Sequence, residues 1–114
     1  MMDTIGNKLT SLCEPILPFF LSEAETETYP YAVYDQTVTP LMTKDGTYAY
    51  AADARVRVYS DDFDEAQQRA DNIITAISTD ADTRYRLRVR GQSKTCQEDV
   101  WCIELDVYIK QIVI

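Results

Sequence analysis

The sequence predicts an α+β domain in which a mostly antiparallel sheet of about four strands packs against two helices, in the order α-β-β-α-β-β. Two segments, residues 48–58 and 101–110, alternate apolar and polar side chains, as strands with one buried face do. Residues 60–78 instead repeat apolar side chains at helical spacing. The 114 residues are enough for one domain, which we place over residues 1–114 because no internal repeat divides them.

The first predicted element is a helix over residues 3–14. Asp3 or Thr4 is available as its N-cap, and Pro15 and Pro18 end or kink it. The apolar residues at helical spacing are Ile5, Leu9, Leu12 and Cys13.

The next segments predict an acidic loop and then a strand. Residues 22–28, SEAETET, have no apolar stripe and are interpreted as the loop. Residues 31–38 are rich in β-branched and aromatic side chains, which favours a strand. Pro40 and the KDG turn signal at 44–46 follow that strand.

The clearest strand and the longer helix come next along the chain. Ala52 and Ala54 lie on the apolar side of the strand over residues 48–58, which predicts that a helix approaches the sheet closely there. Ser60, Asp61 or Asp62 can cap the helix, and Asp62 with Glu65 has the spacing of a capping box. Acidic residues in its first turn suit the helix dipole, so they need no bound metal.

The last two strands should form an antiparallel hairpin across a turn at residues 92–99. Its first strand carries an arginine at every second position: Arg84, Arg86, Arg88 and Arg90. A register that keeps both apolar faces together sets Arg88 opposite Glu104 and Arg86 opposite Asp106, and a slide by two residues would keep the same alternation. In this register Arg84 and Arg90 have no acidic residue opposite them.

The arginine row has two interpretations. Cross-strand ion pairs would make it ordinary solvated surface, and this is the interpretation we favour. Alternatively, Arg84 and Arg90, together with Arg55 and Arg57, meet an acidic surface on a neighbouring subunit. The row does not indicate DNA binding, because the net charge is −8 and general binding to nucleic acid needs a basic surface.

The composition argues against catalysis. The chain has no histidine, which excludes Ser-His and Cys-His pairs and histidine metal ligands, and its three glycines are too scattered for a phosphate-binding loop. Three cysteines without metal-ligand spacing are typical of a reducing compartment, although a Cys96–Cys102 disulfide remains an alternative. We therefore expect no enzyme, no cofactor and no metal. The longest apolar run, Ile16–Leu21, is too short to span a membrane.

Several short motifs resemble the tail-completion or tail-terminator family of tailed bacteriophages and prophages. The resemblance covers about residues 3–110 and includes the order of the elements as well as the motifs. The motifs are YPYAVY at 29–34, TP at 39–40, KDG at 44–46, RVRVYS at 55–60 and DEAQQRADNIITAI at 64–77.

The resemblance implies a structural protein that completes or caps the tail tube and joins tail to head. Such proteins act as rings of identical subunits, often hexamers, beside other tail or head-connector proteins. They assemble in the cytoplasm of the bacterial host and remain in the virion tail, without a membrane or a specific nucleic acid.

A ring needs two different faces of one subunit that fit each other. The candidates here are the arginines Arg55, Arg57, Arg84 and Arg90 and the acidic residues Glu23, Glu25 and Glu27. The alternative function is a small cytoplasmic regulatory or inhibitor domain that binds a host protein through its sheet. Size in solution distinguishes the two, since the alternative predicts a monomer or dimer.

Overall fold

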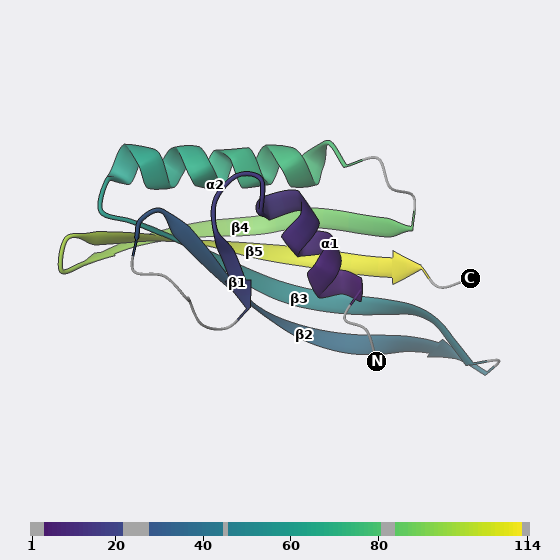
Figure 1. Cartoon of the computed structure of the whole chain (residues 1–114). Coiled ribbons are helices and arrows are strands. Elements are labelled where there is room, and N and C mark those ends of the chain that lie inside the picture. Colours follow the sequence, from purple (N-terminus) through teal and green to yellow (C-terminus); the bar gives the residue numbers. More distant parts are fainter. Residues whose placement is uncertain (1–3, 22–27, 45, 81–83, 113–114) are drawn as a thin grey trace.

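In the computed structural model, which describes residues 4–21, 28–44, 46–80 and 84–112, two helices cover one face of a long, twisted sheet (Figure 1). Strand order in the sheet is β1-β2-β3-β5-β4, and every neighbouring pair is antiparallel except β1 and β2. The elements along the chain are α1 (Thr4–Cys13), β1 (Phe19–Leu21), β2 (Tyr31–Thr43), β3 (Gly46–Ser60), α2 (Phe63–Ser78), β4 (Tyr85–Gln97) and β5 (Val100–Ile112).

The predicted α+β class is confirmed, but the prediction of about four strands is wrong by one. The additional strand, β1, has only three residues and runs parallel to β2 between Ala32 and Tyr34. It lies inside the apolar run Ile16–Leu21, just after Pro18. Three residues are too few to show the period-two alternation by which a strand is recognised, so only the pairing partner reveals it.

The core lies between the helices and the inner face of the sheet. Both helices direct their apolar stripes into it, including Leu9 of α1 and Ile73 of α2, which are fully buried. The predicted close approach of a helix is confirmed, because Ala52 and Ala54 on β3 are buried in the same cluster as Ala66 and Ala70 on α2. Small side chains on both surfaces bring the helix backbone near the sheet.

The start of α2 uses the predicted residues in a modified arrangement. Asp62 is the N-cap, and its side chain accepts a hydrogen bond from the backbone N–H of Asp64. The hydroxyl of Ser60 donates a hydrogen bond to the carboxylate of Glu65, and the same hydroxyl accepts one from the backbone N–H of Asp62. The buried Ser60 thus links the end of β3 to the first turn of α2.

The strand β2 is longer than predicted and continues through Pro40. β1 pairs only with residues 32–34, so β2 is an edge strand at Pro40, with β3 on one side alone. Edge strands tolerate proline, which has no backbone N–H to donate. The predicted turn joins β2 to β3. Gly46 in this turn has a φ of 114°, a backbone angle that residues other than glycine rarely adopt. Asp3 of the predicted α1 cap lies outside the described residues, and Thr4 is the first residue of the helix.

The β4–β5 hairpin is present, but its predicted turn and register are wrong. The turn is formed by Glu98 and Asp99 alone, so β4 extends to Gln97. Leu87 consequently pairs with Ile109 and Val89 with Val107, rather than with Leu105 and Ile103. Displacing each pair by an even number of residues preserves the alternation, which explains why the pattern alone could not select the register.

A β-bulge at Arg90 keeps the apolar side of β4 on the core. Between Val89 and Gly91 the register shifts by one residue, so Arg90 has no partner of its own on β5. If every residue of β4, including Arg90, continued the register set by the two-residue turn, Arg86 and Arg88 would face the core in place of Leu87 and Val89. The bulge therefore reverses the alternation where the helix-covered part of β4 begins.

Asp99→Gly should stabilise the protein by about 0.5–1 kcal/mol. Glu98 and Asp99 have φ values of 53° and 66°, in the left-handed region where a Cβ is unfavourable and where two-residue hairpin turns favour glycine in the second position. Urea denaturation should show a higher midpoint with an unchanged slope. Ser93→Gly in the exposed, regular part of β4 is the control and should destabilise; a loss of stability for both variants would contradict the turn assignment.

Candidate subunit interface

The face of the sheet opposite the helices carries the candidate site. We call it the open face, because no helix among the described segments covers it. Its side chains come from alternate positions of β2, β3, β5 and β4, as the register requires. The charged residues on it are Asp35, Asp53, Arg55, Arg57, Arg86, Arg88, Arg90, Glu104, Asp106 and Lys110.

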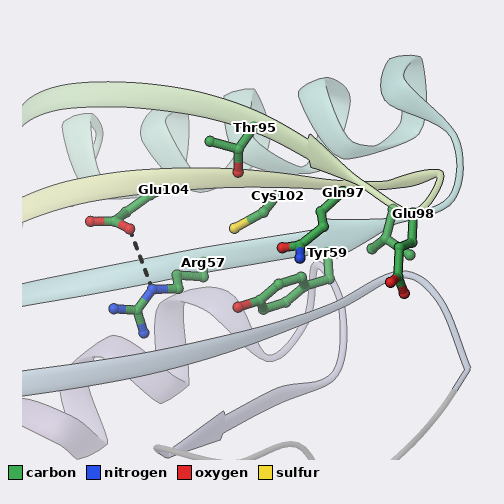
Figure 2. Close-up of a pocket in the computed structure, with 8 residues that line it drawn as sticks. Arg57, Tyr59, Thr95, Gln97, Glu98, Cys102 and Glu104 are labelled. Carbon is green, nitrogen blue, oxygen red and sulfur yellow. Dashed lines mark hydrogen bonds and ion pairs between the residues drawn. The ribbon is translucent and has the colours of Figure 1, made fainter.

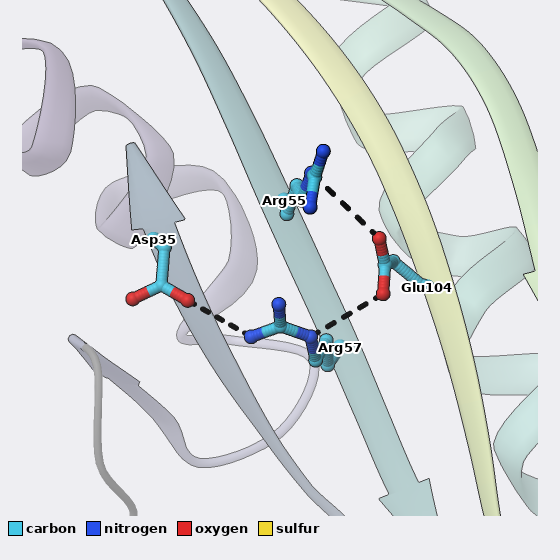
Figure 3. Close-up of polar contacts among 4 residues, drawn as sticks. All are labelled: Asp35, Arg55, Arg57 and Glu104. Carbon is cyan, nitrogen blue, oxygen red and sulfur yellow. Dashed lines mark hydrogen bonds and ion pairs between the residues drawn. The ribbon is translucent and has the colours of Figure 1, made fainter. Parts of the chain in front are cut away.

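Arg57 is the centre of an ion-pair network on the open face (Figure 3). Its Nη1 lies 2.8 Å from Asp35 Oδ2, and its Nε lies 3.3 Å from Glu104 Oε2. Hydrogen bonds to Asp35 and Glu104 raise the pKa of Arg57 above its ordinary value, although partial burial opposes this. Arg57 is thus a cross-link between β2, β3 and β5 within one chain.

Arg55 is attached to the same network only loosely. Its Nε lies 3.8 Å from Glu104 Oε1, and its side chain is 65% exposed compared with 29% for Arg57. An exposed pair at this distance contributes little stability. Of the two β3 arginines proposed for an interface, Arg55 is the more accessible to a second molecule.

Arg90 has no acidic residue opposite it on β5, as predicted, but a carboxylate of β3 pairs with it. Its Nη1 lies 3.1 Å from Asp53 Oδ1 on β3, and its guanidinium lies 4.5 Å from the centre of the Tyr108 ring. The bulge at Arg90 allows it to reach across β5 to Asp53. Arg84 is exposed at the start of the hairpin, with its guanidinium 5.9 Å from the centre of the Tyr85 ring.

The ion pairs predicted for Arg86 and Arg88 are also wrong. Arg86 lies opposite Lys110, and Arg88 lies opposite Tyr108. Both side chains are exposed, and neither has an ion-pair partner within the described parts of the chain. The arginines with available charge are therefore Arg86 and Arg88, which the sequence interpretation had assigned to internal pairs.

The acidic residues proposed to complement the arginines, Glu23, Glu25 and Glu27, lie outside the described residues. Sequence reasoning missed Asp35 and Asp53, the carboxylates that neutralise Arg57 and Arg90. Their alternation along β2 and β3 would have placed them on the arginine side of the sheet. The order of the strands in the sheet, which brings Asp35 and Asp53 close to Arg57 and Arg90, is set by the folded structure.

A shallow depression of about 400 Å³ lies on the open face near the hairpin turn (Figure 2). Cys102 lies in it, and burial is the main cause that raises the pKa of this thiol, so it is protonated at neutral pH. A protonated thiol is a weak nucleophile. Its lining residues are Arg57, Tyr59, Thr95, Gln97, Glu98, Val100, Cys102 and Glu104.

All three cysteines are free thiols. Cys96 pairs with Trp101 and Cys102 with Thr95, so these two cysteine side chains project from opposite faces of the hairpin, and the alternative of a disulfide between them is wrong. In the described part of the chain, no cluster of cysteine and carboxylate side chains is suited to hold a metal ion. The described helices include none with the length and apolarity to cross a bilayer.

Cys13 should react with a thiol reagent at least about 100-fold more slowly than Cys96 at mild alkaline pH. Cys13 is fully buried and burial raises its pKa to about 12, whereas Cys96 is exposed. The measurement is the rate of modification of two variants, Cys96→Ser/Cys102→Ser and Cys13→Ala/Cys102→Ser. Equal rates in the folded state would contradict the burial of Cys13, and denaturant should abolish the difference.

The fold has a counterpart among solved structures. A chain of the "Virion of native gene transfer agent (GTA) particle" is similar to it with a TM-score of 0.64, covering 91% of this chain and 84% of that chain at 17% sequence identity. No protein-family model matches the sequence, and no curated protein does. The likeness shows that a chain of this particle has a similar fold.

Proposed function

We propose that the chain is a non-catalytic structural protein of a phage or prophage tail, which completes or caps the tail tube and joins it to the head as a homo-oligomeric ring. The observation that carries the proposal is the likeness of fold over 91% of the chain to a chain of a gene transfer agent virion. The resemblance of its short motifs and element order to the tail-completion family points to the same function.

The chemistry of the described side chains supports a binding role. The chain has no histidine to act as a general base, and the thiol of Cys102 is held in its protonated form. Ion pairs such as Asp35–Arg57–Glu104 connect three strands instead of surrounding a substrate. A rigid sheet with one open face is suited to contact with another protein surface.

The proposed partners are further copies of this chain and other tail or head-connector proteins. The protein assembles in the cytoplasm of the bacterial host and remains in the virion tail. Its net charge of −8 disfavours general attraction to the DNA backbone. An acidic ring would let DNA pass without binding it.

The test is deletion of the gene from a strain that produces the particles. Electron microscopy should show heads without attached tails or tails of abnormal length, and expression of the wild-type chain should restore normal particles. The purified protein should also form rings visible by negative staining. Normal particles in the deletion strain would contradict the proposal.

The open face and its depression also suit the alternative, a cytoplasmic regulatory domain that binds a host protein. That function requires no ring and no defect in particle morphology. A strict monomer, normal particles and a host protein bound through the open face would together favour it.

A further inference from the structure

The open face has a strongly basic end at the start of the β4–β5 hairpin. We call Arg86, Arg88 and Lys110 the basic end; the first two lie on β4, and Lys110 lies opposite Arg86 on β5. Within the described segments, neither Arg86 nor Arg88 forms an ion pair, while the other open-face arginines Arg55, Arg57 and Arg90 all approach a carboxylate. Arg86 and Arg88 thus present positive charge to solvent in a chain whose net charge is −8.

The opposite layer of the molecule presents negative charge. Helix α2 buries Ala66, Ala70, Ile73 and Ile77, so the side turned away from the sheet carries Asp64, Gln68, Asp71 and Thr75, all exposed. We call these four residues the outer stripe. Exposed Asp61 and Asp62 precede it, and the basic residue of α2, Arg69, is half-buried and donates to the backbone oxygen of Ile16.

The two surfaces cannot meet within one chain. Leu87 and Val89 of β4 face the helix layer, so their neighbours Arg86 and Arg88 point away from α2 across the thickness of the sheet. Two oppositely charged surfaces on opposite layers of one subunit are suited to contact the next subunit in head-to-tail order. Such contacts generate a ring when the rotation between successive copies closes, and a filament when it does not.

We infer that the basic end of one copy docks on the outer stripe of α2 in the next copy. The inference rests on the proposed function, since it names the two surfaces that would build the ring. Spacing is compatible: Arg86 and Arg88 are about 7 Å apart along an extended strand, and Asp64 and Asp71 are about 10 Å apart along the helix axis. Arginine side chains are long and flexible enough to bridge the remaining few ångströms.

Opposite charges hold the two surfaces of this contact together, so the strength of association should depend on salt concentration. Screening weakens attraction between exposed charges, so association should fall as ionic strength rises. Ala51 and Tyr108 lie beside the basic end on the open face and add apolar surface to the contact. The charges therefore select the partner surface and its orientation.

The experiment uses two charge-reversal variants of the full chain, followed by sedimentation velocity at low and high salt. One variant is Arg86→Glu/Arg88→Glu, and the other is Asp64→Lys/Asp71→Lys. All four positions are exposed, so both variants should keep the wild-type melting temperature to within a few degrees. Each alone should need at least about tenfold more protein to assemble than the wild type, because like charges then face each other.

Mixing the two variants in equal amounts should restore assembly. The acidic sheet of the first then meets the basic helix of the second, and the other junction in an alternating ring has wild-type charges on both sides. Lys44→Glu and Glu14→Lys, two exposed positions outside both surfaces, are the matched control and should assemble as the wild type does.

Three outcomes would overturn the inference. Variants that assemble like the wild type would remove both surfaces from the contact while leaving the proposed function intact. Variants that fail alone and also fail as a mixture would show that the basic end meets some surface other than α2. A wild-type chain that stays monomeric at every concentration would overturn the inference together with the ring in the proposed function.

Discussion

Deletion of Arg90 should preserve the β4–β5 hairpin and lower the free energy of unfolding by no more than about 1–2 kcal/mol. Arg90 is the extra residue of the bulge in β4, located between Val89 and Gly91. Without it, the two-residue turn continues a regular register in which Val89 and Leu87 still pair with Val107 and Ile109 on the core side. The deletion leaves Arg86 and Arg88 on the open face, opposite Lys110 and Tyr108, and removes the contacts of Arg90. Urea denaturation measures the loss.

The control is Arg90→Gly, which retains the residue count of the strand and therefore the bulge. It removes the ion pair to Asp53 and the contact with the Tyr108 ring, both exposed, and should cost no more than about 1–2 kcal/mol. Glycine is also well tolerated in bulges. The deletion and the substitution should therefore lose similar stability, and a deletion that costs more than about 4 kcal/mol would contradict the register on either side of the bulge.

Leu105→Ala should lower the free energy of unfolding by about 2–5 kcal/mol. Leu105 is fully buried on the inner face of β5, next to Val56 on β3, and belongs to the core beneath the helices. The loss combines the transfer free energy of the removed methyl groups with the cavity that remains, because a sheet backbone relaxes little around it. Thermal and urea denaturation should agree on the sign.

Leu21→Ala is the matched control for this substitution. Leu21 ends the edge strand β1, and more than half of its side chain is exposed. The same chemical change should cost about 0.5 kcal/mol or less there. Equal losses at the two positions would contradict the assignment of Leu105 to the core.

The corrections to the arginine row change its interpretation. The predicted register gave Arg86 and Arg88 internal partners and left Arg90 available, whereas the structure pairs Arg90 with Asp53 and leaves Arg86 and Arg88 without ion pairs in the described segments. The interpretation that the row is internally neutralised holds for only part of it. An interface role is therefore proposed for Arg86 and Arg88, the two central arginines of the row.

Part of the candidate site was predictable from sequence because it depends on local alternation. Arg55 and Arg57 alternate with the buried Val56 and Val58, which places them on the solvent side of β3. Their partners were not predictable, since Asp35 and Glu104 reach Arg57 from strands on either side of β3. Which strands flank β3 depends on the folded topology.

The sequence by itself determined the α+β class, both helices and the buried side of each long strand. These properties follow from periodicity within one element, as the stripe Ala66, Ala70, Ile73 and Ile77 illustrates. Only the tertiary structure decided the pairing of β1 with β2, the register of the last hairpin and the partner of each arginine. A shift by an even number of residues leaves every apolar side chain on the same face, so alternation cannot choose among such registers. The choice is made by the turn at Glu98–Asp99 and the bulge at Arg90, which act through the packing of β4 beneath α2.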